Sequence, residues 1–444
     1  MYRYFFIGAK RKFPMSALVL AISLILTLLP VTFLFAGCKS DVSQKESPEI
    51  VTLRLFSNLP DRKNGQGLIE QMIVDEFEET HPDIKIEIEC LDEEAYKTKF
   101  RAYAMDGMPD IVSVWGQPAF LDDIIDAGML AELPISDYED YGFEQNSLTG
   151  FMKNNKLYGL PRNTDMIAIY YNKRIFREEN LTLPTNRNED VALCKKLSDA
   201  GITPVAMDGL DGWPLVEYFD NCLLTVSGEK RTELLTNAIM YADFSHEDFD
   251  KALRMLKGDV KKGIFQEDFA YCDYGTAMAL FTAEETAMYY MGSWEASMAV
   301  NEAIPPKIRD NIGVFTMPGF NPNIKNAMVW FGGGYSISAH SMHYAEAKEF
   351  IDYMFLPEHL SKYGWENGIG MSAQDQTAFM LGNETTLQKE WLSILDEADI
   401  ISGTPINDLG SSGFKYAIES NIARAATGEI SSDAFFKILE EACR

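Results

Sequence analysis

The sequence predicts an α/β protein that has a parallel sheet and more than one domain. Residues 51–56 alternate in the manner of a strand, a helical stripe follows, and residues 84–88 alternate again. The same order then repeats as far as an apolar run at residues 109–114. Strand–helix–strand units of this kind form parallel sheets. The length of 444 residues is that of two or three domains.

The first unit is defined by its hydrophobic periods. Val51–Phe56 alternates and is rich in β-forming residues, and Ile84, Ile86 and Ile88 alternate with charged residues. Between these strands, the apolar side chains fall on one helical stripe, at Leu68, Ile69, Met72, Ile73 and Phe77.

The second unit places an aromatic residue at the end of a buried strand. A helix over 93–105 precedes the apolar, β-branched run that ends at Val114. Trp115 and Gly116 follow at its carboxyl end, where ligands bind in open α/β sheets. The pattern then predicts a helix over 121–133, which Gly128 interrupts near its end.

Two later segments are candidates for crossings between domains. Gly159 and Pro161 punctuate the chain just before a strong strand over 166–172. The run Val329–Ile337 contains three successive glycines and is the second candidate.

The remainder of the chain alternates between helices and short breaks. Residues 190–310 are helix-rich, with turns at Asp208–Gly212 and at Gly292. The other expected elements are a strand at 312–317, an amphipathic helix at 344–354, and helices from Gln388 onward with a Gly/Ser break at 402–413.

The first 37 residues have the layout of a secretory signal. Basic residues are confined to the start, an uncharged apolar run follows from Phe13 to Gly37, and Ala36–Gly37 precede Cys38. This ending resembles a bacterial lipobox, in which the thiol of Cys38 would receive a diacylglycerol, although Phe35 stands where leucine is usual. An uncleaved membrane anchor is the alternative, because the run is long enough to span a bilayer. Residues 38–49 are expected to be a linker, and the rest of the chain lies outside the membrane under either reading.

Charge and cysteine usage exclude several classes of function. The formal net charge is −28 and becomes −32 without residues 1–37, so nucleic acid is not an expected partner. Five cysteines besides Cys38 are scattered and never form a C-x-x-C pair, which argues against a disulfide framework and a zinc site. His340 and His343 are expected to lie in a solvated turn, and no cofactor or metal is predicted.

Five segments in this order resemble the extracellular solute-binding proteins that serve ABC importers, in particular the carbohydrate-type cluster. Phe77–Ile88 resembles the first helix and second strand of that family, and Tyr158–Phe176 its hinge and crossing strand. The remaining segments are "PDIVSVW" with "DAGMLAELP", "FTAEETAMYYMGSW", and "WFGGGYSIS" with "EAKEFIDYMFLPE".

The resemblance implies a two-lobed fold of the periplasmic-binding-protein type, with a hinge and a ligand cleft between the lobes. One lobe would comprise residues 50–163 and 331–371, and the other 164–330 and 372–444. Hinge closure needs a few backbone positions that absorb dihedral change, and Gly159–Pro161 and Gly332–Gly334 fit that task. The triple glycine is not a phosphate loop, since no Lys-Ser or Lys-Thr pair follows it.

The implied function is that of a monomeric, lipid-anchored protein at the outer face of the cell membrane. It would capture a sugar or oligosaccharide and deliver it to an ABC permease, without catalysis. The chain departs from the family at Glu284, where glycine is usual, at Thr286, and at 185–189. We do not expect these positions to line the cleft, but they keep a non-sugar solute open as a ligand.

Tryptophans beside glycines are the main candidates for ligand contacts. An indole ring offers a large apolar face to a sugar, and its N–H is a polar handle. The five within two residues of a glycine are Trp115, Trp213, Trp294, Trp330 and Trp365, whereas Trp391 lies inside a predicted helix. Core or hinge packing is the alternative role for each of the five.

Polar candidates accompany these aromatic residues. A carboxylate can accept two hydroxyl hydrogen bonds at once, which fixes the orientation of a sugar. We single out Asn58 after the first strand, Asp165 at the first crossing, and Asp211 and Glu366 beside tryptophans. A solvated turn or a helix cap is the alternative for each of them.

A secreted carbohydrate-active enzyme is the competing hypothesis. Glycosidases need two acids that face each other at a set separation, and the sequence contains no pattern that pairs two carboxylates in this way. No G-x-S-x-G nucleophile motif occurs either.

Overall fold

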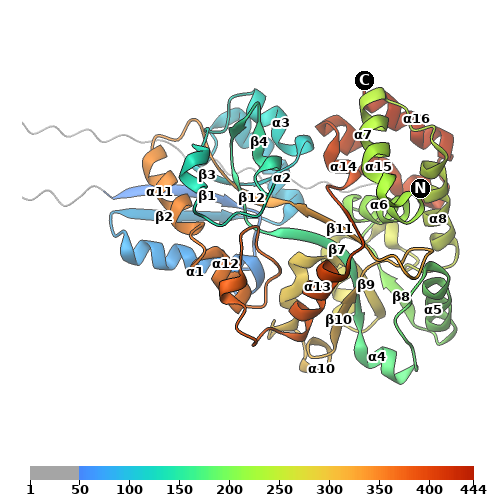
Figure 1. The fold of residues 1–444 in the computed structure, drawn as a ribbon. Helices are drawn as coiled ribbons and strands as arrows, with labels where there is room; N and C mark the ends of the chain where they lie inside the picture. Colours follow the sequence, from blue (N-terminus) through green and yellow to red (C-terminus); the bar gives the residue numbers. More distant parts are fainter. Residues whose placement is uncertain (1–49) are drawn as a thin grey trace, which may run out of the picture. The chain divides into compact units, whose positions relative to one another are not determined.

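The computed structural model describes residues 50–444, and Figure 1 shows them as two sheets that are each covered by helices. The predicted signal, Cys38 and the linker lie outside the described residues. The first sheet has the strand order β2-β1-β3-β12-β6, and the second has the order β13-β11-β7-β9-β8 with β10 beside β7. We call the part of the chain packed on the first sheet the first lobe, and the part packed on the second sheet the second lobe.

The first lobe begins with the predicted parallel units. Its strands are β1 (Val51–Ser57), β2 (Ile84–Cys90) and β3 (Ile111–Trp115), and β1 lies between the other two and pairs with both in parallel. The connecting helices are α1 (Gly65–Thr80) and α2 (Glu93–Asp106). The predicted strand–helix–strand units are therefore confirmed.

A late segment of the chain completes the first sheet. Strand β12 (Gly333–Ile337) pairs antiparallel with both β3 and β6 (Leu160–Pro161), and Figure 1 shows it in orange among the blue and cyan strands. The other elements of this lobe are α3 (Pro118–Asp126), β4 (Met152–Lys153), β5 (Lys156–Leu157), α11 (Tyr344–Met354) and α12 (Leu360–Glu366).

The helix predicted over 121–133 is wrong beyond Asp126. The helix α3 ends there, and Gly128 has a φ of +70°, which a helix cannot continue through. The apolar residues Leu130 and Leu133 form isolated bridges to Ser338 and Leu157 instead, so their side chains enter the core from extended backbone.

The second sheet is arranged around one long strand. Strand β7 (Thr164–Asn172) pairs on one side with β9 (Thr286–Gly292). Its other side pairs first with β11 (Asn326–Phe331) and then with β10 (Ile312–Phe315). The edge strands are β8 (Thr203–Ala206) and β13 (Ile400–Ser402).

Helices cover the second sheet and account for most of the second lobe. They are α4 (Lys173–Glu178), α5 (Arg187–Asp199), α6 (Trp213–Ser227), α7 (Arg231–Tyr241), α8 (Glu247–Lys261), α9 (Tyr274–Thr282), α10 (Pro306–Arg309), α13 (Thr386–Glu397), α14 (Ile406–Leu409), α15 (Ser412–Thr427) and α16 (Ser432–Ala442). The apolar run Met288–Met291 lies within β9 and is fully buried in the core. Trp391 is likewise a core residue at 1% exposure.

Three segments connect the lobes side by side. The chain passes from β6 to β7 at residues 162–163, and it returns from β11 to β12 at Gly332. The third connection is near Met371, whose carbonyl accepts a hydrogen bond of 2.9 Å from the N–H of Thr164. These connections set how the facing surfaces of the two lobes lie.

Candidate functional site

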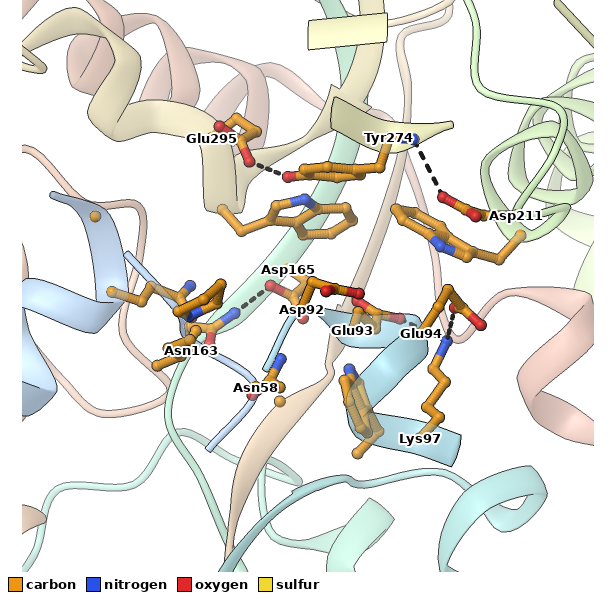
Figure 2. Close-up of a pocket in the computed structure, with 18 of the residues that line it drawn as sticks. Asn58, Asp92, Glu93, Glu94, Lys97, Asn163, Asp165, Asp211, Tyr274 and Glu295 are labelled. Carbon is orange, nitrogen blue, oxygen red and sulfur yellow. Dashed lines mark hydrogen bonds and ion pairs between the residues drawn. The ribbon is translucent and has the colours of Figure 1, made fainter. Parts of the chain in front are cut away.

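A cavity of about 730 Å³ lies between the two lobes. On the first lobe it adjoins the carboxyl ends of β1 and β3, the edge at which open α/β sheets bind ligands. Figure 2 shows Tyr274, Asp211 and Glu295 on one side of it, and Asp92, Glu93, Glu94 and Lys97 on the opposite side. Its volume is in the range of ligand pockets, about 300–1,000 Å³.

The structure brings seven of the nine predicted site residues to this cavity. They are Asn58, Trp115, Asp165, Asp211, Trp213, Trp294 and Trp330. They come from both lobes and from both β-strand crossings, although they are spread over more than 270 positions of the sequence. Topology, rather than sequence proximity, assembles this set.

Trp365 and Glu366 do not line the cavity, so the placement predicted for them is wrong. Both lie on α12, which packs against α1 in the first lobe. Trp365 is 4% exposed, and its carbonyl accepts a hydrogen bond of 2.9 Å from the Gln388 amide. Glu366 is exposed to solvent. The glycine beside Trp365 belongs to a helix and not to a loop at the end of a strand.

Trp294 occupies space that only a glycine leaves open. It follows β9 in the short 3₁₀ helix Ser293–Ala299, and its six-membered ring lies against the α-carbon of Gly292, where any Cβ would collide with it. Gly292 has a φ of −88°, so the glycine is required by space and not by backbone conformation. Trp294 is half-buried and turns part of its surface to the cavity.

Trp294 belongs to a row of aromatic rings on the second-lobe side. Its ring centroid lies 5.8 Å from that of Trp213 and 6.1 Å from that of Trp330, and Trp213 lies 6.2 Å from Tyr274. Tilted and edge-on contacts at these distances are favourable and hold each ring in place. The second lobe therefore presents a rigid apolar surface to the cavity.

The first lobe presents a single indole on the other side. Trp115 ends β3, and its ring is held edge-on by Phe120 at 5.0 Å and by Tyr96 at 5.8 Å. The ammonium of Lys97 lies 5.6 Å from the Trp115 ring centroid, which is within the range of a cation–π contact. A ligand in the cavity would thus lie between aromatic groups of the two lobes.

Asp165 lies at the crossing between the lobes, opposite Trp330 in the β7–β11 pair. A Cβ at Gly332 would collide with its carboxylate, so this glycine makes room for the acid. The Asn163 amide donates a hydrogen bond to Asp165 Oδ1, as Figure 2 shows. Burial raises the pKa of Asp165 to about 7, although the charge of Arg162 and the N–H of Gly333 favour the ionised form.

Asn58 is held by one hydrogen bond from its backbone and one to its side chain. Its N–H donates to Ser113 Oγ at 3.4 Å, and its Oδ1 accepts from Arg162 Nη1 at 3.2 Å. The guanidinium of Arg162 also lies 5.6 Å from the ring centroid of Tyr335. This arrangement fixes the Asn58 amide at the end of β1.

Asp211 connects to a second chain of hydrogen bonds. Its Oδ2 accepts from the N–H of Tyr274 at 3.1 Å, and the Tyr274 hydroxyl donates to Glu295. The N–H of Asp211 donates to Asp208 Oδ1 at 3.0 Å. Burial and the negative charge of Asp211 raise the pKa of Asp208 to about 9, which keeps this acid neutral at physiological pH.

Comparison with known proteins assigns the family. The family model of the bacterial extracellular solute-binding protein matches residues 62–359 of this chain. The chain belongs to this family.

Relatives and solved structures agree with the assignment. This solute-binding protein is 26% identical over 340 residues to the multiple sugar-binding protein of Streptococcus mutans, a match that covers 74% of this chain and 77% of the relative. Its fold is similar to a structure from a study of xylan utilization by the thermophilic bacterium Caldanaerobius polysaccharolyticus, with a TM-score of 0.79, 22% identity, and 88% and 99% of the two chains covered. A chitin oligosaccharide binding protein matches with a TM-score of 0.77, 18% identity, and 89% and 98% covered. The predicted two-lobed α/β fold is confirmed.

The cavity of this solute-binding protein is strongly acidic. Ten carboxyl side chains line it, against three basic side chains. The acids are Asp61, Asp92, Glu93, Glu94, Asp165, Asp211, Glu217, Asp273, Glu295 and Asp408, and the bases are Lys97, Arg162 and Lys415.

Most of these charged residues escaped the sequence-based prediction. The acids of α2 resemble an ordinary charged helix start in the sequence, and Glu217 lies on a mostly apolar helix. The segment 402–413, expected to be a break, contains the short helix α14, which supplies Asn407 and Asp408 to the cavity. One usable signal was Tyr274, an aromatic residue followed by a glycine, as the predicted tryptophans were.

Residues 50–444 contain neither a candidate metal site nor a disulfide nor a membrane-spanning helix. No group of three or more His, Cys, Asp or Glu within residues 50–444 is arranged to hold a metal. The five cysteines of this range are free, and three of them are buried thiols: Cys194, Cys222 and Cys272. No helix in residues 50–444 has the length and apolar character needed to cross a membrane.

Proposed function

We propose that this solute-binding protein captures a sugar or oligosaccharide between its two lobes. The observation that carries the proposal is the pairing of aromatic surfaces from both lobes with hydrogen-bonding acids at the rim of the same cavity. Aromatic rings match the apolar C–H faces of a sugar, and carboxylates and amides match its hydroxyl groups. The names of the two relatives that bind sugars, one multiple sugar-binding and one chitin oligosaccharide binding, support it.

Seven residues are proposed as ligand contacts. Trp294 and Trp213 would stack on the sugar from the second lobe, and Trp115 from the first. Trp330 would contribute from the crossing. Asn58, Asp165 and Asp211 would bind hydroxyl groups, because each is oriented by its own hydrogen bonds while it borders the cavity.

The transport role and its anchoring are part of the same proposal. The protein would act as a monomer without catalysis and would deliver its ligand to an ABC permease at the outer face of the cell membrane. Cys38 would carry the lipid, and the linker would separate it from the lobes. We propose lobe boundaries of 50–163 with 331–371, and 164–330 with 372–444; the division of the strands between two sheets supports those near 163 and 331.

A thermal-shift screen of the full chain against a panel of glycans tests the proposal. A ligand at ~100 times its Kd adds ~2.7 kcal/mol to the unfolding free energy, so a true ligand should raise the melting temperature by several degrees. Chromatography of the ligand after incubation should show no product. Turnover would instead support a carbohydrate-active enzyme, and a panel without a single shift would contradict sugar binding.

A further inference from the structure

One corner of the cavity holds a buried acid that has no partner. Glu217, on α6, is 3% exposed and borders the cavity, and its carboxyl group forms no hydrogen bond or ion pair with another described residue. Asn407, on α14, is 1% exposed and also borders the cavity, and its Oδ1 atom has no partner within residues 50–444. The helices α6 and α14 pack together, and the charge of Asp408, next to Asn407, acts on Glu217, so both helices contribute to the same part of the second-lobe wall.

The isolation of Glu217 is unusual among the acids of the cavity. Each of the other nine has at least one hydrogen bond or ion pair within the chain. A buried carboxyl group without such a partner is costly in an ordinary folded protein. The missing partner is therefore expected to come from the ligand.

The cations of the cavity do not supply that partner. Lys415 pairs with Asp408 at 2.6 Å and with Glu419 at 2.9 Å, and Glu419 also accepts from the Asn407 amide at 2.9 Å. Lys97 pairs with Glu93 at 2.7 Å and with Glu94 at 2.8 Å. The charged groups that face Glu217 are Asp408, Lys415, Asp165 and Glu93, so negative charge exceeds positive charge around it.

The unpartnered atoms in this corner are all hydrogen-bond acceptors. They are Oε2 of Glu217, which accepts once this carboxyl group has given up its proton, and the amide oxygen of Asn407. A hydroxyl group has one hydrogen to donate, whereas a primary ammonium has three and also carries the compensating charge. We propose that the Glu217–Asn407 corner binds a primary ammonium group, and that the natural ligand is an amine-bearing sugar; the sugar part of this inference rests on the proposed function.

Proton release should accompany binding. Burial and the nearby charge of Asp408 raise the pKa of the Glu217 carboxyl group well above its ordinary value, which favours the neutral acid in the ligand-free protein. An ammonium in contact with it would favour the carboxylate. The proton of Glu217 would then pass to the buffer when the ligand binds.

Calorimetry with matched tetrasaccharides tests the inference on the full chain. The probes are the β-1,4-linked glucosamine tetramer, its N-acetylated counterpart, and cellotetraose, which carries a hydroxyl in place of each amine. We expect the amine-bearing tetramer to bind at least ~30-fold more tightly than either other probe, and the apparent enthalpy to vary with the ionisation enthalpy of the buffer. Equal affinity for cellotetraose, or no binding of any amine-bearing probe, overturns the inference.

The variant Glu217→Gln tests whether this corner causes the preference for the amine-bearing tetramer. It keeps the shape of the side chain and removes its ability to ionise, so it should abolish both the amine preference and the proton release. Glu229→Gln is the matched control, since it makes the same change at an exposed residue outside the cavity and should retain both. Retention of the preference in Glu217→Gln overturns the inference, and the comparison of wild-type probes stands even if that variant fails to fold.

A fourth probe separates this inference from the proposed function. Spermidine carries primary ammonium groups but no sugar. If it binds with Glu217-dependent affinity while every sugar fails, the ammonium site is supported and the carbohydrate function is wrong. If neutral sugars bind and every amine fails to improve on them, the function is supported and the ammonium site is wrong.

Discussion

At the scale of single residues, the position of the Trp294 ring requires a glycine at position 292. A tryptophan beside a tight turn is hard to bury completely, and here the missing Cβ of Gly292 lets the indole fold back on the chain. One part of the ring packs against the core of the second lobe, and the rest borders the cavity. The two roles that the sequence left as alternatives, core and cleft wall, are both served by the same side chain.

Trp294→Ala should therefore reduce affinity more than stability. We expect sugar affinity to fall at least ~30-fold, equivalent to ~2 kcal/mol, because the variant removes a central aromatic contact. The unfolding free energy should fall by less than the ~3–5 kcal/mol typical of a core tryptophan, since part of the ring faces the cavity. Calorimetry of binding and urea unfolding measure the two effects.

Trp391→Ala is the matched control for that variant. Trp391 is 1% exposed and does not border the cavity, so its loss should lower stability severely and leave the affinity of the folded fraction unchanged. If Trp294→Ala behaves in the same way as Trp391→Ala, the indole of Trp294 is a core residue and not a ligand contact.

Glu284 shows how a departure from the family pattern is accommodated. Its φ of +63° lies in the left-handed region, which glycine adopts without strain and glutamate does not. The side chain offsets this cost by ion pairs with Arg174 at 2.5 Å and Lys307 at 2.8 Å. Burial would raise its pKa, but hydrogen bonds from Lys307, Arg174 and Asn172 hold it at about 2. The residue lies outside the cavity, so the departure concerns the fold and not the ligand.

At the scale of elements, contacts between α3 and α15 link the two lobes. Ser412, at the start of α15, donates a hydrogen bond of 2.6 Å to Asp123 on α3. It is an exposed contact that exists only while the lobes are close together. Such contacts are suited to tune the balance between open and closed forms, since each adds little free energy.

Removal of this contact should speed ligand release. Ser412→Ala and Asp123→Ala should each raise the dissociation rate by up to ~5-fold, corresponding to about 1 kcal/mol or less. The double variant should behave like either single variant, because both changes remove the same bond. Stopped-flow tryptophan fluorescence measures the rates. If the effects of the two single changes simply add, this bond does not help to hold the lobes closed.

At the scale of the whole molecule, buried acids make stability depend on pH. Burial raises the pKa of Asp165 to about 7, and burial with the charge of Asp211 raises that of Asp208 to about 9, against ordinary values near 4. The folded chain thus binds these protons more tightly than the unfolded chain. Their stabilising contribution is complete below pH ~4 and is lost as the pH rises through the folded-state values.

Asp208→Asn should therefore flatten the decline of stability between pH 7 and pH 9. Each such group contributes up to ~1.4 kcal/mol per pH unit to the slope, and asparagine can still accept the hydrogen bond from the N–H of Asp211. Urea unfolding at pH 5, 7 and 9 measures the slope. An unchanged slope in the variant would mean that Asp208 is already ionised at neutral pH.

At low pH, stability is lost through carboxylates whose pKa is lowered in the folded chain, such as that of Glu284. Because the pKa of Glu284 is held at about 2, its contribution is present above the ordinary glutamate value of 4.5 and is lost as the pH falls toward 2. The unfolding free energy is therefore expected to be greatest near pH ~4.5, because Glu284 is still ionised there and the decline caused by Asp165 and Asp208 has only begun.

Local patterns in the sequence were sufficient for most of the fold and for part of the site. The strands β1 and β2 and the helix α11 follow from periodicity, because an alternating or helical stripe buries one face. The strands β3 and β7 follow from continuous apolar runs, because both of their faces are buried. The tryptophans beside strand-end glycines predicted a wall of the cavity for the same local reason. Trp365 did not follow the rule, because its glycine lies inside α12.

Most of the charged residues of the site, apart from Asp165 and Asp211, were decided by tertiary structure alone. Glu217, Asn407 and Lys415 come from three helices of the second lobe, and each reads in isolation as an ordinary helix residue. What distinguishes them is burial against one another around a shared cavity, where each charge needs a partner and Glu217 has none within the described chain. Periodicity determines which face of an element is buried, but the energy of a buried charge depends on neighbours that only the packed lobes bring together.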